Sequence, residues 1–254
     1  AEGAEDYLYV VVRRYINGSY VRYIERMASR AFSDQKDAFF VDSGLTFDGT
    51  NTGSDTMTLS GGTTWAPGEA LTLTGSAAWT AFPATTDVGD AVVLTDSDGA
   101  KYTLTIVSVS STTVASVTTD KTIPAALRAA ATTEWALARN TMSGLDHLEG
   151  ETLNVLADGA VHPQRTVSSG AITLDAPAVI VHAGLPITAD AQTLPAILQT
   201  DSAFGQGRVK NINKAWLRVY RSSGIWIGPD AEHLVEAKQR TTEPYGSPPA
   251  LKSD

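Results

Sequence analysis

The sequence predicts an all-β fold, built mainly from antiparallel strands in a meander, a barrel or a sandwich. Short runs rich in Val, Ile, Thr and Tyr recur along the 254 residues, and such residues favour the half-buried surface of a sheet. Turn residues separate these runs at intervals of roughly 8–12 residues, which is the spacing of strands in all-β proteins. Only one stretch, residues 123–131, has a convincing helical composition.

The N-terminal part of the chain predicts a hairpin and one further strand. Residues 7–16 and 20–25 are rich in Tyr, Val and Ile, and Asn17 and Gly18 lie between them. Asn-Gly is the strongest short-range hairpin signal, because both turn positions require positive φ. Residues 39–41, with the sequence FFV, predict the next strand, which the DSG that follows would end.

Residues 49–133 predict a compact β-module with a composition of its own. Thr and Ser are abundant among them, and only three residues are basic. The clearest element is a hairpin of residues 91–95 and 101–109, with Asp98 and Gly99 at its tip.

A short helix is predicted at the end of this module, and strands resume after it. Residues 123–131 read IPAALRAAA, in which Pro124 suits a first helical turn and alanine favours continuation. Residues 135–140 then alternate in the manner of a strand. Further strands are predicted near residues 152–157, 160–167, 171–174 and 178–184, and a long one at 207–228.

These elements predict three parts. Residues 1–48 and 134–186 would form one discontinuous β-domain, with residues 49–133 inserted into it. Residues 187–254 would form a further β segment that ends in a truncated linker. The first residue is Ala rather than Met, and the chain stops in PYGSPPALKSD. We therefore expect a fragment or a processed product of a longer protein.

The net charge of −9 is concentrated in the middle of the chain. Counting Lys and Arg against Asp and Glu gives −1 for residues 1–43, −5 for 44–133, −4 for 134–186 and +1 for 187–254. Tight nucleic-acid binding is built from clustered Lys and Arg, so the composition argues against a sequence-specific DNA-binding protein. No apolar run is long enough to span a bilayer, and the acidic start AEGAED lacks the basic region of a signal peptide. The absence of cysteine excludes disulfides, thiolate metal sites and a cysteine nucleophile in this chain.

One short stretch, SGLDHLEGE, gathers the side chains of a possible catalytic or metal site. It places four such residues within six positions: Asp146, His147, Glu149 and Glu151. Metal-binding helices space their ligands so that they share a face, but glycines at 144 and 150 disfavour a helix here. We therefore predict a solvated or hydrogen-bonded turn rather than a ligand set.

The other titratable candidates are scattered. The chain has four histidines, His147, His162, His182 and His233. The strand pattern around His182 predicts a half-buried residue with its hydrogen bonds satisfied. Two carboxylate pairs, Asp96 with Asp98 and Glu149 with Glu151, would suit a glycoside hydrolase, but acids beside turns are common in an acidic β-protein. We predict no catalytic, cofactor-binding or metal-binding residue and no cofactor.

Sequence signatures of nucleotide and hydrolase sites are missing. The serines before Gly61 and Gly170 are not in a G-x-S-x-G motif, and GQG at 205–207 lacks the spacing of a dinucleotide fingerprint. Trp65 and Trp79 could offer stacking platforms to a carbohydrate, although packing in the fold is the favoured interpretation.

Several separated motifs, in a consistent order, carry a resemblance to a known family. They are VVVRRYINGSYVRYIERM, FFVDSGLTFDG, the run from SGLDHLEGE to HAGLPI, and GRVKNINKAWLRVYRSSGIWIG. Together they resemble tail proteins of short-tailed bacteriophages and related prophages, in the tail-tube nozzle or tail tubular protein B group. The resemblance covers residues 7–48 and 134–248 and leaves 49–133 outside.

The resemblance implies a β-rich structural protein of the virion tail, made in the host cytoplasm and without catalysis. Its copies would assemble with other tail proteins into a homo-oligomeric ring that forms part of the channel for genome exit. DNA would pass without specific binding, and no membrane anchor is implied. Within the insertion, VGDAVVLTDSDGAKYTLTIVSV is similar in fold to the first catalytic-cysteine half-domain of ubiquitin-activating enzymes. Activating chemistry does not follow from it.

Two other functions stay open from the sequence, a carbohydrate- or receptor-binding module of a virion and a cell-wall glycan hydrolase. For the ring, we expect the fragment to be largely monomeric at micromolar concentration, because ring interfaces are heterologous and a fragment presents them only in part. Basic residues near the C-terminal end would meet the acidic 134–186 face of a neighbour. These residues are Arg208, Lys210, Arg218 and Arg221.

Overall fold

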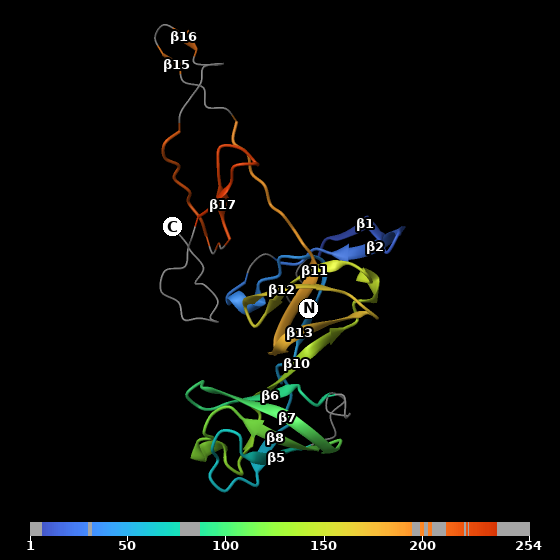
Figure 1. Ribbon diagram of the computed structural model, residues 1–254, viewed down its shortest axis with the longest axis vertical. Helices are drawn as coiled ribbons and strands as arrows, with labels where there is room; N and C mark the ends of the chain where they lie inside the picture. The colour runs from blue at the N-terminus through green and yellow to red at the C-terminus, as the bar shows by residue number, and fades with distance from the viewer. Residues whose placement is uncertain are drawn as a thin grey trace. The chain divides into compact units, whose positions relative to one another are not determined.

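The computed structural model confirms the all-β prediction (Figure 1). It describes residues 7–29, 32–76, 87–194, 199–200, 203–204, 212–220, 222 and 224–237. The paired strands are antiparallel, and no sheet in this described part of the chain closes into a barrel. The chain divides into two compact units, Ala1–Pro186 and Ile187–Asp254.

The first element is the predicted hairpin. β1 (Tyr9–Ile16) pairs with β2 (Ser19–Arg26) in continuous register, and the two strands form a sheet of their own. Asn17 and Gly18 form the turn with φ values of 46° and 79°. The turn residues therefore set this hairpin as the sequence predicts.

A four-stranded sheet follows the order β12-β11-β14-β3. Its strands are β3 (Asp42–Asp48), β11 (Thr152–Ala157), β12 (Ala160–Thr166) and β14 (Ile180–Leu185). Three of the four agree with the predicted strands to within two residues. The predicted strand at residues 39–41 is wrong, because β3 begins only at Asp42 and runs through the DSG that was expected to end it.

A bulge explains why β3 accepts this polar start. Ser43 has a φ of 51°, and the register between β3 and β14 shifts between Ala183 and Leu185. Gly44 and Gly184 lie against each other at this point, where a Cβ on Gly184 would be 2.6 Å from the Cα of Gly44. Glycine permits this close approach of the two strands, so local hydrophobicity is not what places β3.

The larger sheet has eight strands in the order β13-β10-β6-β7-β8-β5-β4-β9. The predicted hairpin at 91–109 is confirmed as β6 and β7. The strands are β4 (Met57–Ser60), β5 (Ala70–Gly75), β6 (Ala91–Thr95), β7 (Lys101–Ser111), β8 (Val114–Thr119), β9 (Ala131–Thr132), β10 (Trp135–Ser143) and β13 (Ala171–Ala178).

Two hydrophobic cores lie within the first unit. One takes its buried side chains from residues 57–137, including Leu59, Leu104 and Ile106. The other contains Ile16 and buried side chains between residues 142 and 183. The cores therefore divide along the sequence within β10, between residues 137 and 142.

Two segments that run side by side connect these cores. Leu137 donates its N–H to the carbonyl of Gly49, and Asn51 donates to the carbonyl of Trp135. The first half of β10 pairs with β6, whereas its second half pairs with β13 across a register shift between Arg139 and Thr141. A Cβ on Gly49 would lie 1.9 Å from the carbonyl oxygen of Leu137, so the close approach requires glycine.

The predicted helix at residues 123–131 is wrong. Only one 3-10 turn, Ala125–Leu127, forms there. Ala129 has a φ of 53° and donates its N–H to the carbonyl of Leu59, while Arg128 donates its guanidinium N–H groups to the carbonyl of Ile123. Hydrogen bonds to the sheet edge thus override the helical preference of an alanine-rich stretch.

The second unit contains two short hairpins among its described residues. They pair β15 (Gln199–Thr200) with β16 (Ala203–Phe204), and β17 (Trp226–Ile227) with β18 (Val235–Glu236). The long strand predicted for residues 207–228 is wrong over 212–220, where the chain is irregular. Residues 207–211 of that prediction lie outside the described residues.

Candidate functional site

The acidic stretch around His147 is a structural turn in the fold. Asp146–Leu148 form a 3-10 turn, flanked by Gly144 and Gly150 with φ values of 86° and 80°. Glu149 accepts the N–H groups of Ser169 and Gly170 at 2.9 and 2.8 Å. Its carboxylate therefore caps a second turn, which lies about twenty positions further along the chain.

His147 joins this turn to two other elements. Its Nε2 lies 2.8 Å from the carbonyl oxygen of Ser43 at the bulge of β3, and a carbonyl can only accept, so Nε2 donates. The hydroxyl of Tyr23 on β2 donates to the carbonyl of His147 at 2.8 Å. The histidine thereby fastens the N-terminal hairpin and β3 to the same turn.

Replacing His147 with Ala is expected to lower the free energy of unfolding by about 1–3 kcal/mol, because the carbonyl of Ser43 loses its donor. The measurement is urea unfolding followed by circular dichroism, with the exposed neighbour Asp146→Asn as the matched control. If the protein retains one equivalent of a transition metal after dialysis, and the His147→Ala variant loses it, the structural assignment is wrong.

The other histidines are also hydrogen bonded. His162 on β12 lies 2.7 Å from the carbonyl of Pro163 through Nδ1, and its Nε2 accepts the N–H of Asp175 at 3.0 Å. His233, in the second unit, pairs with Asp230 at 2.6 Å. Each of these two histidines therefore makes local hydrogen bonds within its own unit.

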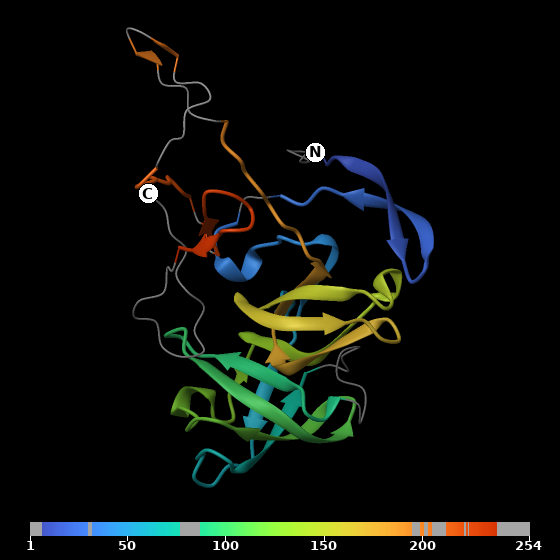
Figure 2. The same ribbon diagram turned by 45° about the horizontal axis from the view of Figure 1, so that its top comes forward.

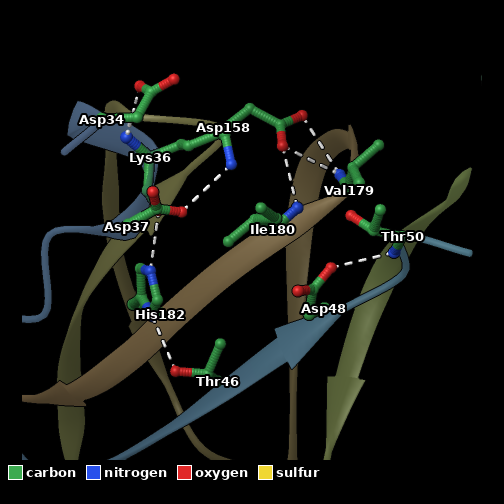
Figure 3. A network of polar contacts seen from close by, with 10 residues as sticks. All are labelled: Asp34, Lys36, Asp37, Thr46, Asp48, Thr50, Asp158, Val179, Ile180 and His182. Atoms are coloured by element: carbon green, nitrogen blue, oxygen red, sulfur yellow. Dashed lines mark hydrogen bonds and ion pairs between the residues drawn. The ribbon is translucent and has the colours of Figure 1, made fainter. Parts of the chain in front are cut away.

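His182 on β14 is the centre of a buried polar contact (Figure 3). It is only 6% exposed. Nε2 lies 2.8 Å from the carbonyl of Lys36 and must donate to it, which leaves Nδ1 to accept from the hydroxyl of Thr46 at 2.7 Å. Phe39 packs its ring against the imidazole with ring planes 87° apart. The prediction that its hydrogen bonds are satisfied is confirmed, although the residue is buried rather than half-buried.

Four exposed carboxylates surround this contact, and we call them the acidic end. They are Asp34, Asp37, Asp48 and Asp158, drawn in Figure 3. Asp158 accepts the N–H of Ile180 at 2.8 Å, and Lys36 pairs with Asp37 at 3.1 Å. The hydrogen bond that Lys36 donates to Asp37 raises the pKa of Lys36, and the charges of Asp34 and Asp48 contribute in the same direction. The four acids are therefore gathered around a single lysine.

Two buried carboxyl groups, on Asp87 and Asp90, lie at the bend of β10 and are each 5% exposed. Asp90 accepts the N–H of Asn140 at 2.8 Å, and Arg139 lies 3.9 Å from Asp87. Burial raises the pKa of Asp90, against the opposing effects of Asn140 and Arg139. Nowhere among the described residues do three or more His, Asp or Glu side chains form a group that could hold a metal ion.

Glu69 organises the loop between β4 and β5. Its carboxylate accepts backbone N–H groups from Thr63 and Ala66 and the hydroxyl of Thr64. The bond from the Thr63 N–H, followed by that from the Thr64 hydroxyl, lowers the pKa of Glu69 to about 2. The charged carboxylate is therefore the form that the folded loop favours.

This shift predicts a stability that depends on pH. The contribution of Glu69 is fully present above its ordinary pKa of 4.5 and is lost as the pH falls towards about 2, because the folded state then binds the proton less readily than the unfolded state. Glu69→Gln is expected to lower the urea midpoint at neutral pH and to differ progressively less from the parent over that window. Glu134→Gln, at another exposed turn, is the control. A difference that stays constant with pH would contradict the assignment.

Two of the aromatic and carboxylate candidates from the sequence, Trp65 and Asp96, make contacts within the fold. Trp65 is partly buried against the first core, with the guanidinium of Arg128 over its ring at 5.6 Å. Asp96 accepts the N–H of Ala100 at 2.8 Å in the β6–β7 turn, beside Asp98.

Four residues singled out in the sequence lie outside the described residues. They are Trp79 and three of the predicted basic contact positions, Arg208, Lys210 and Arg221. Arg218 is exposed.

The feature that sequence reasoning missed is one face of the N-terminal hairpin. The eight side chains of this outer face are all exposed, and three of them are arginines without an acidic neighbour on the face. They are Tyr9, Val11, Arg13 and Tyr15 on β1, and Tyr20, Arg22, Ile24 and Arg26 on β2. The alternation of these residues with Val12, Arg14 and Ile16 was visible in the sequence and could have identified the face.

The opposite face of the hairpin is anchored to the protein. Ile16 is 6% exposed and belongs to the second core. Arg14 donates two hydrogen bonds to Glu25, at 2.7 and 2.8 Å, and lies 3.6 Å from Asp42 at the start of β3. The bond to Glu25 raises the pKa of Arg14 and lowers that of Glu25. A two-stranded hairpin is marginal by itself, so these contacts are what hold the outer face in place.

Neither a protein-family model nor a curated protein sequence matches this chain. None of the helical segments in the described residues is long and apolar enough to cross a membrane.

Proposed function

We propose that the protein is a non-catalytic structural component of a bacteriophage or prophage tail, part of the nozzle or tube through which the genome leaves. The proposal starts from the ordered motifs in residues 7–48 and 134–248. The observation that carries it furthest is the outer face of the hairpin, which lies within the first of those motifs. An anchored element that presents arginine, tyrosine and aliphatic side chains to solvent is typical of an interface that assembles with another protein.

Two further properties support this function. The polar groups around His147 and His182 bind backbone carbonyls and hydroxyls, which is how structural side chains are used. The chain is acidic, with a net charge of −9, and like charge on a channel wall raises the cost of contact with phosphate. DNA would pass through such a channel without being held.

A second candidate, a carbohydrate- or receptor-binding module, is favoured by two exposed tryptophans in the second unit. Trp216 is 84% exposed and Trp226 is 58% exposed. Exposed tryptophan rings are suited to stack on apolar ligand surfaces. These two tryptophans are the structural observation that supports a carbohydrate- or receptor-binding function.

The test is electron microscopy of the full-length protein, alone and with its tail partner, together with binding to a glycan array. Closed rings without glycan binding support the tail function. A protein that stays monomeric in both conditions and binds a glycan would contradict it and support the second candidate.

A further inference from the structure

The hairpin is a positively charged element on an acidic chain. Residues 7–27 contain four arginines and one glutamate and so carry a net charge of +3. With −9 for the whole chain, the remaining residues carry −12. Glu25 and Arg14 neutralise each other on the anchored face, so the outer face keeps the charge of Arg13, Arg22 and Arg26.

Two of the three tyrosine rings on this face are already in contact with neighbouring side chains. The guanidinium of Arg13 lies 3.9 Å from the ring centre of Tyr20, and Tyr15 packs edge-on against the same ring at 5.1 Å. Proteins that bind single-stranded nucleic acid offer open rings on which bases stack. Here the ring of Tyr20 is instead covered by Arg13. The net charge of −12 on the rest of the chain would also repel a polyanion.

Aliphatic side chains complete the surface. Val11 and Ile24 are directly opposite in the register and are 70% and 77% exposed. An apolar pair flanked by arginine and tyrosine has the composition of a protein interface, where these residue types are enriched. The partner of such a surface needs exposed carboxylates around a small contact area.

The acidic end of the same protein fits that requirement. Its four carboxylates surround one lysine, which gives a net charge of −3 against the +3 of the outer face. The carboxylates are exposed, and hydrogen bonds to backbone N–H groups fix the orientation of Asp158 and Asp48. Fixed carboxylates lose little side-chain entropy on binding, which favours recognition of arginine.

Within one chain, the outer face of the hairpin and the acidic end are too far apart to contact each other. The hairpin is anchored at the start of β3, through Asp42 and Ser43, whereas Asp48 ends this strand. Seven residues of extended strand separate the two points by roughly 20 Å. Figures 1 and 2 both show the hairpin towards the right end of the four-stranded sheet and the blue turn at residues 35–37 towards its left end. Complementary surfaces at opposite ends of a subunit produce heterologous, head-to-tail contacts.

We propose that the outer face of the hairpin in one copy of this chain docks on the acidic end of a second copy. The inference rests on the proposed function in that it names the contact through which copies of a tail protein would associate. The contact is electrostatic at its rim and apolar at the Val11–Ile24 pair. Head-to-tail repetition of this contact closes a ring when the rotation between copies permits it.

The experiment uses the absence of cysteine from the chain. A Met27→Cys chain, with its thiol at an exposed position beside Arg26, is activated with a short bismaleimide and purified. It is then mixed with a Thr50→Cys chain, whose thiol lies beside Asp48 at the acidic end. The matched control is Val107→Cys, at a position on β7 that is 50% exposed. Coupling to position 50 is expected to be about tenfold faster than coupling to position 107 at low salt and to slow as salt is raised.

Charge reversal makes the assignment specific. Arg13→Glu with Arg22→Glu in the activated chain is expected to remove the difference between positions 50 and 107. Asp34→Lys with Asp37→Lys in the partner should restore it, and Asp37→Lys alone serves if the double variant does not fold. Equal coupling at the two positions, or coupling that ignores charge reversal, overturns the proposal. It is also overturned if a thymidine 30-mer binds the parent chain at physiological salt and not the Arg22→Glu variant, because the face would then bind nucleic acid.

Microscopy of the full-length protein separates this inference from the proposed function. Rings that form equally well with and without the Arg13→Glu and Arg22→Glu changes refute the docking contact and leave the tail function intact. Selective coupling in a protein that forms no closed ring with its tail partner and binds a glycan refutes the tail function, and the contact between copies itself stands.

Discussion

A chain in which residues 49–133 are replaced by a short Gly/Ser linker is expected to remain folded and rich in β-structure. The buried side chains of the second core come from Ile16 and from residues 142–183, and none of them lies in the replaced segment. The linker has a short distance to span, because Gly49, the first replaced residue, is hydrogen bonded to Leu137, which lies just beyond the end of the replaced segment. Closing a short linker also costs little conformational entropy.

The shortened chain is compared with the intact protein by far-ultraviolet circular dichroism and urea unfolding. It is expected to lose the part of the unfolding free energy that the first core provides and still to unfold in one cooperative transition. Leu137 contributes to the first core and stays in the shortened chain, so Leu137→Thr is the matched variant that removes its exposed apolar surface. A random-coil spectrum for both shortened chains would refute the prediction that residues 49–133 are an inserted module.

Replacing His182 with Ala is expected to lower the free energy of unfolding by about 3 kcal/mol, which is large for a single substitution. The imidazole is 6% exposed and hydrogen bonded at both nitrogens. Its removal leaves a cavity and deprives the carbonyl of Lys36 of its donor, and both effects destabilise a buried site. Thr46→Val removes only the hydroxyl and is expected to cost about 1 kcal/mol.

Urea unfolding measures these changes, and His233→Ala provides the matched control. His233 also pairs with an aspartate but is exposed, so its removal is expected to change the stability by less than about 0.5 kcal/mol. If His182→Ala is as mild as His233→Ala, the network in Figure 3 does not hold the 35–37 turn to the sheet.

The parts of the fold that local chemistry determines were predictable from the sequence. Asn17 and Gly18 specify their turn through positive φ, and the strands at 152–157 and 160–166 are delimited by turn residues. Two wrong predictions, the strand at residues 39–41 and the helix at 123–131, have the same cause: contacts with residues distant in the sequence determine the structure there. Phe39 and Phe40 are apolar because they pack against His182 and Phe32, and the alanines after residue 127 meet the edge of β4.

The candidate site was predictable only in outline. The turn around His147 follows from its glycines, but its partners Ser43 and Tyr23 are more than one hundred positions away in the sequence. No local pattern reports contacts at that separation. The outer face of the hairpin is different, because alternation alone places Arg13 and Tyr15 on one side. What alternation does not reveal is that the hairpin stands outside any larger sheet, so that this side meets solvent.

The paired segments between the two cores have a mechanical consequence. Residues 49–51 lead from the second core to the first, and the start of β10 leads back beside them. A tensile force that separates the cores is thus divided between two covalent strands under parallel load. The force acts along both segments in the same direction. The hydrogen bonds that Gly49 and Asn51 make with β10 are therefore not sheared.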